Sequence, residues 1–326
     1  MGIIAPLVSI LIPCYNGEQW VAQSISSALS QTWPNKEIVV VDDGSTDGSL
    51  EIIRSFGNAV RVESGPNRGA NVARNRLLQL SNGSWLQYLD ADDYLLPTKI
   101  SDQLSCDPDP SIDVIYSPMT IETWRYNQPG ERIELPVTSD DPWLLLARAQ
   151  MPGTHAVLMR RSAIIEVGGW KPDQPCCQEH ELFLRLLMGG KKFAYVPEIG
   201  AIYRQWSENT VSNKDPSQTV IRRLAIVDAA EQYLRDTDAI KPVHSDAFAS
   251  QRIELARTLY RFNRSAAMEI VAKAARIRPS FKLTEDTPSF PRLYRVVFNN
   301  VGFRAAEYIA EMTRSWRRRT QLDIVP

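Results

Sequence analysis

Short apolar segments alternate with amphipathic segments along the first two-thirds of the chain. The segments 8–13, 37–41 and 60–63, and the run that ends at Asp90, are apolar or rich in β-branched residues, which predicts strands. Apolar residues recur at helical spacing between them, as at Val21, Ile25 and Ala28, after a candidate N-cap at Asn16. This alternation predicts a mostly parallel α/β sheet with helices on both faces.

The pattern changes twice further along the chain. Strands are expected at 113–116, 156–159, 193–196 and 201–204, and the last two are expected to complete the sheet. An irregular connection is expected between Pro129 and Pro142, and a helix over 181–188. Beyond about Pro216 the pattern becomes wholly helical. We therefore expect an α/β catalytic domain over 1–215 and a C-terminal helical region over 216–326.

The composition excludes several classes of protein. The 326 residues are 44% hydrophobic, which is ordinary for a globular protein. Their net charge of −1 gives no general electrostatic attraction to nucleic acid, so no nucleic-acid partner is expected. Its four cysteines lack metal-ligand spacing and are typical of a reducing compartment. The apolar start predicts a first strand rather than a signal peptide, and no apolar run is long enough to span a bilayer. A cytoplasmic protein is expected.

Three polar clusters follow directly after predicted strands: Cys14-Tyr15-Asn16, Asp42-Asp43 and Asp90-Ala91-Asp92-Asp93. If the strands are parallel, these clusters share the sheet edge at which α/β proteins bind ligands. Three nearby carboxylates require a neutralising partner, and Mg²⁺ carrying phosphates would supply it. Each cluster alone also fits ordinary turn chemistry or a solvated acidic turn.

Six short motifs occur in a fixed order: Pro13-Cys-Tyr15-Asn16, Val41-Asp-Asp43-Gly-Ser45, Asn67-x-Gly69 with Ala73-Arg74-Asn75, Leu89-Asp-Ala-Asp92-Asp93, Gly168-Gly169-Trp170, and Gln178-Glu179-x-Glu181-Leu-x-x-Arg185. In this order they resemble the inverting family 2 of nucleotide-sugar glycosyltransferases, over roughly the first two-thirds of the chain. The resemblance implies a GT-A type fold, a donor sugar on a nucleoside diphosphate such as UDP, and a saccharide or lipid-linked acceptor. It also implies polysaccharide or glycoconjugate synthesis.

The resemblance assigns roles to residues of the three clusters. It implies that Asp92 holds Mn²⁺ or Mg²⁺ on the diphosphate, with Asp90 near the ribose or the waters of the metal, and Ala91 between them. From their chemistry, Asp43 can accept hydrogen bonds from a base edge or ribose, and Tyr15 can lie against a base. Pro13 and Asn16 would shape the floor of the nucleotide pocket. Arg74 could face a phosphate or pair with Asp92, or be a solvated helix charge, and Asp93 is expected to cap a helix or loop.

The transfer also needs a base for the acceptor hydroxyl. The family often carries Glu-Asp at the start of the late helix, whereas this chain has Gln178-Glu179, so the resemblance implies Glu179 as the base and leaves its reach open. His180 and Glu181 are competing candidates, with an exposed histidine and a helix-end charge as their plainer interpretations.

Several features leave alternatives open. Trp206 cannot bind a metal but can cover a sugar, and His155 either lines the acceptor side or is structural. Tyr308, Met312 and Trp316 lie beside Arg314 and Arg317–Arg319, which fits either peripheral contact with the inner face of a membrane or a solvated helix end. A catalytically weak nucleotide-sugar-binding protein and a nucleotidyltransferase are the rival functions.

Overall fold

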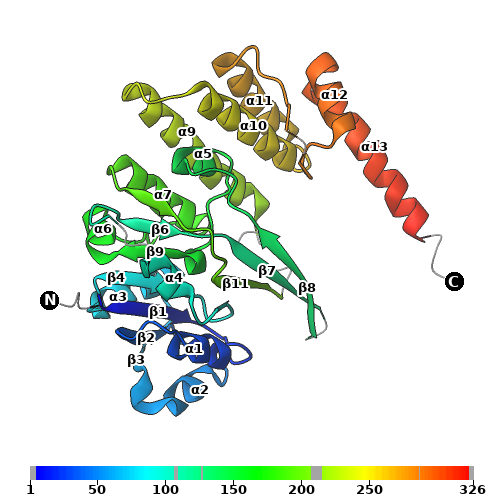
Figure 1. Ribbon diagram of the computed structural model, residues 1–326. Coiled ribbons are helices and arrows are strands. Elements are labelled where there is room, and N and C mark those ends of the chain that lie inside the picture. Colours follow the sequence, from blue (N-terminus) through cyan, green and yellow to red (C-terminus); the bar gives the residue numbers. More distant parts are fainter. Residues whose placement is uncertain (1–4, 106–108, 126–127, 207–214, 286, 323–326) are drawn as a thin grey trace. The chain divides into compact units, whose positions relative to one another are not determined.

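The computed structural model describes residues 5–105, 109–125, 128–206, 215–285 and 287–322, with side chains as far as residue 314. The chain divides into two compact units, Met1–Asp215 and Pro216–Pro326, whose elements are labelled in Figure 1. Each unit is described by itself. Residues 1–4 of the apolar start, and the side chains of Trp316 and Arg317–Arg319, lie outside the described part.

A seven-stranded sheet forms the centre of the first unit, in the order β10-β6-β9-β4-β1-β2-β3. Its strands are β1 (Val8–Cys14), β2 (Lys36–Asp42), β3 (Arg61–Ser64), β4 (Trp85–Tyr88), β6 (Val114–Tyr116), β9 (Val157–Arg160) and β10 (Phe193–Tyr195). Only β9 runs antiparallel to its neighbours. The predicted mostly parallel α/β sheet is therefore confirmed.

Helices bury the faces of this sheet. The described helices of the first unit are α1 (Val21–Leu29), α2 (Ser49–Ser55), α3 (Ala70–Leu80), α4 (Lys99–Ser105), α5 (Pro142–Ala147), α6 (Arg161–Glu166) and α7 (Gln178–Met188), with short 3-10 turns at Gly57–Ala59 and Thr154–Ala156. Ile10 and Ile12 of β1 pack with Val21 and Ile25 of α1, while Leu11 between them is equally buried. Successive side chains of a strand point to opposite faces, so β1 is covered on both, which explains its continuous apolar sequence.

A second, four-stranded sheet has the order β5-β11-β7-β8. It consists of β5 (Tyr94–Leu95), β11 (Ala201–Gln205), β7 (Met119–Arg125) and β8 (Gln128–Leu135). The expectation that 201–204 completes the main sheet is therefore wrong, because β11 pairs with β7 and β5 instead. The irregular connection expected from Pro129 also contains β8, whose residues are all exposed and whose polar–apolar alternation is confined to its last four residues, Arg132 to Leu135.

Two helix starts differ from expectation. Helix α1 begins at Val21 with Trp20 as N-cap, so the predicted N-cap at Asn16 is wrong. Asn16 has a left-handed backbone (φ 50°), and its Oδ1 accepts a 2.8 Å hydrogen bond from the backbone nitrogen of Thr46. Helix α7 begins at Gln178, three residues before the predicted start. The side chain of Asn16, which suggested a helix cap, closes a loop instead.

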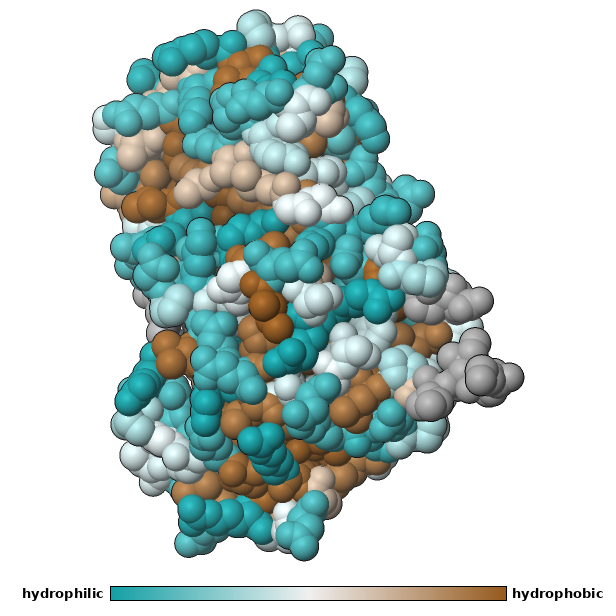
Figure 2. All heavy atoms as spheres, turned by 90° about the vertical axis from the view of Figure 1, so that its left-hand side faces the viewer, coloured by the Kyte–Doolittle hydropathy of each residue, from teal (hydrophilic) through white to brown (hydrophobic). Residues whose placement is uncertain are grey.

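The second unit is helical in its described part. Its helices are α9 (Pro216–Asp236), α10 (Pro242–Leu259), α11 (Arg264–Ile277), α12 (Arg292–Val301) and α13 (Phe303–Leu322). Ile253, Ile270, Phe290 and Phe303 belong to their shared apolar core. None of the described helices is long and apolar enough to cross a bilayer. The view in Figure 2 shows hydrophobic residues interspersed with hydrophilic ones on that face of the protein.

Candidate active site

The carboxyl ends of β1, β2 and β4 bring the three polar clusters to one edge of the main sheet. Cys14 at the end of β1 is in register with Asp42 of β2, and Leu11 with Tyr88 of β4. Asp43 donates its backbone N–H to the carbonyl oxygen of Cys14 at 2.8 Å. The loops that carry Tyr15, Asp43 and Asp90 therefore leave adjacent parallel strands side by side.

Asp43 closes the loop that precedes helix α3. Its two carboxylate oxygens accept hydrogen bonds from the backbone nitrogens of Arg68 (2.9 Å) and Gly69 (2.8 Å), and its side chain is nearly buried. Each carboxylate oxygen has a second lone pair, so Asp43 can still accept from a ligand. Tyr15 is 52% exposed beside it, which leaves its ring free for a planar group.

Two of the three carboxylates in the acidic cluster have a basic side chain as partner. Asp90 Oδ1 lies 2.8 Å from Arg74 Nη2, and Asp93 Oδ2 lies 3.2 Å from His155 Nδ1. Asp92 is different: its Oδ2 accepts a 2.9 Å hydrogen bond from the indole Nε1 of Trp206, a neutral donor. Burial, followed by the charges of Asp93 and Asp90, raises the pKa of Asp92 to about 7.

This donor set fits a divalent cation that arrives with phosphate. The described residues contain no group of three or more His, Cys, Asp or Glu side chains arranged to hold a metal ion by themselves. Mg²⁺ commonly uses only one or two protein carboxylates and takes its other ligands from phosphates and water. A bound cation would relieve the unfavourable charge on Asp92, and Asp90 stands close by with one oxygen held by Arg74.

Arg74 connects the acidic cluster with the start of helix α7. Besides Asp90, it donates to Gln178 Oε1 at 2.6 Å and to Asn71 Oδ1 at 3.2 Å, and its guanidinium lies 4.9 Å from the ring centre of Trp170. The predicted pairing of Arg74 with Asp92 is wrong, because the guanidinium reaches Asp90. Arg74 is also buried rather than a solvated helix charge.

Glu179 lies in the first turn of α7, next to the Gln178 that Arg74 holds. Its side chain is 35% exposed, and its Oε1 is 3.7 Å from His180 Nδ1. Burial alone would raise the pKa of Glu179, but His180, then the backbone N–H of Glu179 and the charge of Arg74, hold it at about 2. Glu179 is therefore ionised at neutral pH, as a proton acceptor must be.

The two neighbours of Glu179 are poorer candidates for a base. His180 is buried, so the expectation of an exposed histidine at the helix start is wrong. Glu181 is also buried and forms ion pairs with Arg185 (2.8 Å) and Lys171 (2.6 Å). Its carboxylate is thus committed to holding α7 and the preceding loop.

Strand β11 supplies residues whose positions the sequence did not reveal. Burial, followed by the charges of Asp93, Asp92, Asp90 and Glu179, raises the pKa of Tyr203 to about 12. The ring of Tyr203 stacks on buried His155, which has a structural place beside Asp93.

Arg204 holds the backbone of the acidic cluster. Its Nη1 donates to the carbonyl oxygen of Asp92 at 2.6 Å, and its backbone N–H donates to Asp93 Oδ1 at 2.8 Å. Asp93 therefore fixes β11 rather than capping a helix or its own loop. The guanidinium of Arg204 lies 4.2 Å from the ring centre of Trp20 and 5.3 Å from that of Trp124. No sequence motif predicts the contacts of Arg204 with Trp20 and Trp124, because the three residues come from separate segments of the chain.

Comparison with known proteins identifies relatives of the first unit. Residues 9–168 match Glycosyl transferase family 2. An uncharacterized glycosyltransferase, YibD, of Escherichia coli K12 is 31% identical over 172 residues, which are 49% of this chain and 50% of YibD. An Escherichia coli enzyme named UDP-Glc:alpha-D-GlcNAc-diphosphoundecaprenol beta-1,3-glucosyltransferase WfaP is 40% identical over 100 residues, 30% of this chain and 40% of WfaP. The chain thus spans half or less of the length of these relatives.

Solved structures share the fold at low sequence identity. Residues 1–349 of S. aureus TarS superpose with a TM-score of 0.62 at 15% identity, covering 94% of this chain and 91% of that one. TarS has also been solved with UDP-GlcNAc. The mannosyltransferase PcManGT of Pyrobaculum calidifontis, solved with GDP-Man and Mn²⁺, has a TM-score of 0.54 at 16% identity and covers 96% of this chain and 88% of its own.

Proposed function

We propose that the chain is a glycosyltransferase of family 2 that moves a sugar from a UDP sugar to an acceptor hydroxyl with inversion; the family match of residues 9–168 and the GT-A type fold shared with TarS support this premise. One observation carries the proposal. Arg74 bridges Asp90 and Gln178, so the start of α7, which carries Glu179, is tied to the acidic cluster at the sheet edge. The effect of all four carboxylates on Tyr203 supports the same convergence.

The nucleoside would bind over the ends of β1 and β2. The exposed ring of Tyr15 offers a surface for a base, and Asp43 has free lone pairs for a base edge or ribose. Pro13 and Asn16 would shape the floor of this pocket, and the hydrogen bonds that tie the loop of Asn16 to Ser45 and Thr46 support this role. The choice of UDP is supported by the UDP complexes of TarS and by the name of WfaP.

The diphosphate would extend toward the acidic cluster. Asp92, with Asp90 beside it, would hold Mn²⁺ or Mg²⁺ there. When bound, the cation would offset the negative charge that develops on the departing diphosphate. Mn²⁺ in the complex of PcManGT supports this cofactor. Arg74 pairs with Asp90 and donates to Gln178, so we assign it to positioning Asp90 and α7 beside the bound donor.

Glu179 would act as the general base. The hydroxyl proton of the acceptor passes to a carboxylate oxygen of Glu179 as the acceptor oxygen attacks the anomeric carbon and the bond to the diphosphate oxygen breaks. Attack from the side opposite the leaving group inverts the anomeric carbon, and no covalent enzyme intermediate forms. A pKa of about 2 makes the ligand-free Glu179 a weak base. The negative charge of a bound diphosphate would raise this pKa toward the working range.

The acceptor and the biological setting rest on likeness alone. WfaP is named for a diphosphoundecaprenol-linked acceptor, which supports a saccharide or lipid-linked acceptor and a role in polysaccharide or glycoconjugate synthesis. The absence of Lys and Arg from 14–20 argues against a nucleotidyltransferase, which usually has a basic phosphate loop there. Gln178 in place of the usual Glu favours a catalytically weak nucleotide-sugar-binding protein. The side chain of Gln178, however, accepts a hydrogen bond from Arg74, and Glu179 supplies the carboxylate that a base requires.

Hydrolysis of UDP sugars in the presence of Mn²⁺ tests the proposal. We expect slow release of UDP by the parent, a loss of at least about 100-fold in Glu179→Gln from general-base catalysis, and parental rates in Asp173→Asn. Asp173 is an exposed carboxylate just before α7, so this control makes the same chemical change outside the site. Equal rates in the parent and Glu179→Gln would refute the base, and binding without turnover in the parent would favour a nucleotide-sugar-binding protein.

A further inference from the structure

A cationic cavity lies within the second unit, apart from the residues assigned above. It has a volume of about 420 Å³, and seven residues line it: Lys282, Leu283, Arg292, Arg295, Val296, Asn299 and Asn300. Three of the seven are cationic and none is acidic. A volume of this size lies within the usual range of small-ligand sites, roughly 300–1,000 Å³.

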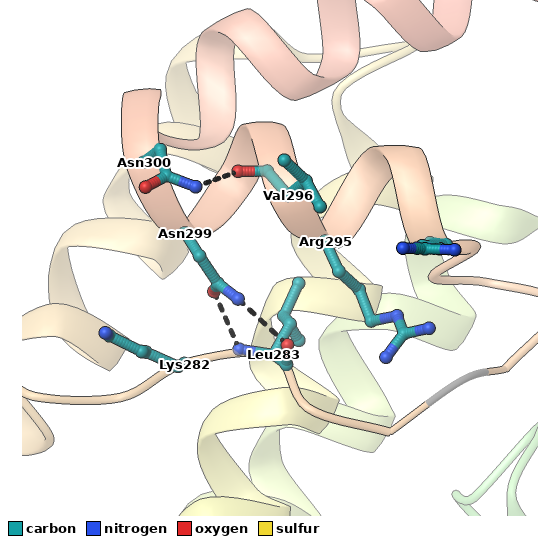
Figure 3. Close-up of a pocket in the computed structure, with 7 residues that line it drawn as sticks. Lys282, Leu283, Arg295, Val296, Asn299 and Asn300 are labelled. Carbon is teal, nitrogen blue, oxygen red and sulfur yellow. Dashed lines mark hydrogen bonds between the residues drawn. The ribbon is translucent and has the colours of Figure 1, made fainter.

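The cavity has a constructed wall rather than a loose loop. Asn299 of α12 pairs with the backbone of Leu283, accepting from its nitrogen at 2.9 Å and donating to its carbonyl oxygen at 3.0 Å (Figure 3). Arg295 donates to the carbonyl oxygen of Thr284 at 2.6 Å. These bonds fix the segment 282–284 against α12, so the backbone that carries Lys282 is held beside the helix that carries Arg292 and Arg295.

The positive charge of this cavity is not neutralised by its own lining. No described carboxylate forms an ion pair with Lys282 or Arg292. Arg292 also occupies the first position of α12, where the helix dipole is positive and favours an anion rather than a cation. The helix end and the side chains of Lys282 and Arg292 therefore all contribute positive potential to the cavity.

Exposed apolar side chains border the cations on the same helix. Leu293 and Val296, three residues apart on α12, are 59% and 53% exposed, and Val296 lines the cavity itself. Residues at this spacing lie on one helix face. Cations beside exposed apolar groups match a ligand that has an anionic head and an apolar part.

We propose that this cavity is a binding site for a phosphate or diphosphate group. Lys282 and Arg292 provide charge-assisted hydrogen bonds, Asn300 adds a polar edge, and Asn299 is a positioning residue that holds the wall in place. The apolar border at Leu293 and Val296 favours a phosphate carried by an amphiphile, as in an anionic lipid headgroup. The site is independent of the proposed transfer reaction.

The test follows the methyl resonances of Val296 in ¹³C-labelled full-length protein, because this residue reports on the cavity alone. The probes are inorganic diphosphate, phosphatidylcholine vesicles, and the same vesicles containing phosphatidylglycerol. The pocket variant is Lys282→Ala/Arg292→Ala. The control is Arg276→Ala/Arg304→Ala, which removes two exposed cations that do not line the cavity.

We expect saturable shifts of the Val296 resonances that weaken at least about tenfold in the pocket variant and stay parental in the control. A response to diphosphate alone identifies a soluble phosphate ligand. A response to the phosphatidylglycerol vesicles, with or without diphosphate, identifies a lipid headgroup. No shift with either probe, or equal weakening in the two double variants, overturns the proposal. Thermal midpoints of all proteins check that the variants are folded.

Discussion

Replacement of Arg74 by methionine removes the cation that joins the acidic cluster to helix α7. Arg74 is 7% exposed and forms a 2.8 Å ion pair with Asp90, together with hydrogen bonds to Gln178 and Asn71. Methionine keeps much of the apolar stem but leaves these three acceptors without their donor. The change therefore isolates the guanidinium group.

The cost can be worked from the exposure of the partners. Breaking a fully buried ion pair destabilises a protein by about 3–5 kcal/mol, because one charge remains unpaired. The side chain of Asp90 is 33% exposed, so water can solvate part of its charge and the lower end of that range applies. With the lost hydrogen bond to Gln178, we expect Arg74→Met to lower the free energy of unfolding by about 3 kcal/mol.

Urea denaturation of the parent, Arg74→Met and Arg76→Met measures this effect. Arg76 lies on the same helix and pairs with Glu63, but both side chains are about two-fifths exposed, so its variant should match the parent within error. Asp90→Asn should be less harmful in the Arg74→Met background than in the parent. If Arg74→Met loses no more stability than Arg76→Met, the reasoning about the buried connection is refuted.

Three further predictions concern other parts of the first unit. The pKa of Asp92 is raised to about 7, so the folded protein binds this proton more tightly than the unfolded chain does. Raising the pH from about 5 to about 8 should therefore destabilise the ligand-free parent relative to Asp92→Asn. A difference between their urea midpoints that does not change with pH contradicts this. Burial lowers the pKa of Lys99 well below its usual value, so the unfolded chain binds the proton more tightly than the folded protein does. Lys99→Met should therefore raise the Tm, by an amount that grows as the pH falls from about 10 to about 7. A lower Tm in Lys99→Met contradicts this prediction. A Cβ on Gly83 would lie 2.6 Å from the backbone nitrogen of Ser9, so Gly83→Ala should lower the Tm, whereas Gly65→Ala, with open space, should not; similar Tm values for both disagree.

The central sheet was predictable because each of its buried strands is marked by a short continuous apolar segment of the sequence. The strands β1 and β2 are buried on both faces, so their apolar runs are continuous and stand out from the amphipathic helices. The polar residues after Cys14, Asp42 and Leu89 follow from where those strands end. Parallel pairing then brings the clusters together without further information.

The second sheet and the partners of the acidic residues were not predictable in the same way. Strand β8 is wholly exposed and begins Gln-Pro-Gly, so its polar–apolar alternation is limited to Arg132 to Leu135. Arg74 reaches Asp90 and Gln178, which are 16 and 104 residues away, and Arg204 is 112 residues from Asp92. Such long-range contacts are decided by packing, so the sequence could identify the ionisable residues but not pair them.

The central claim is that Asp92 and Glu179 serve one donor site in different ways. Calorimetric titration of UDP with and without Mn²⁺ tests it most directly, in the parent, Asp92→Asn and Glu179→Gln. We predict that Mn²⁺ strengthens UDP binding in the parent and in Glu179→Gln, and that this gain disappears in Asp92→Asn. An undiminished gain in Asp92→Asn would contradict the account.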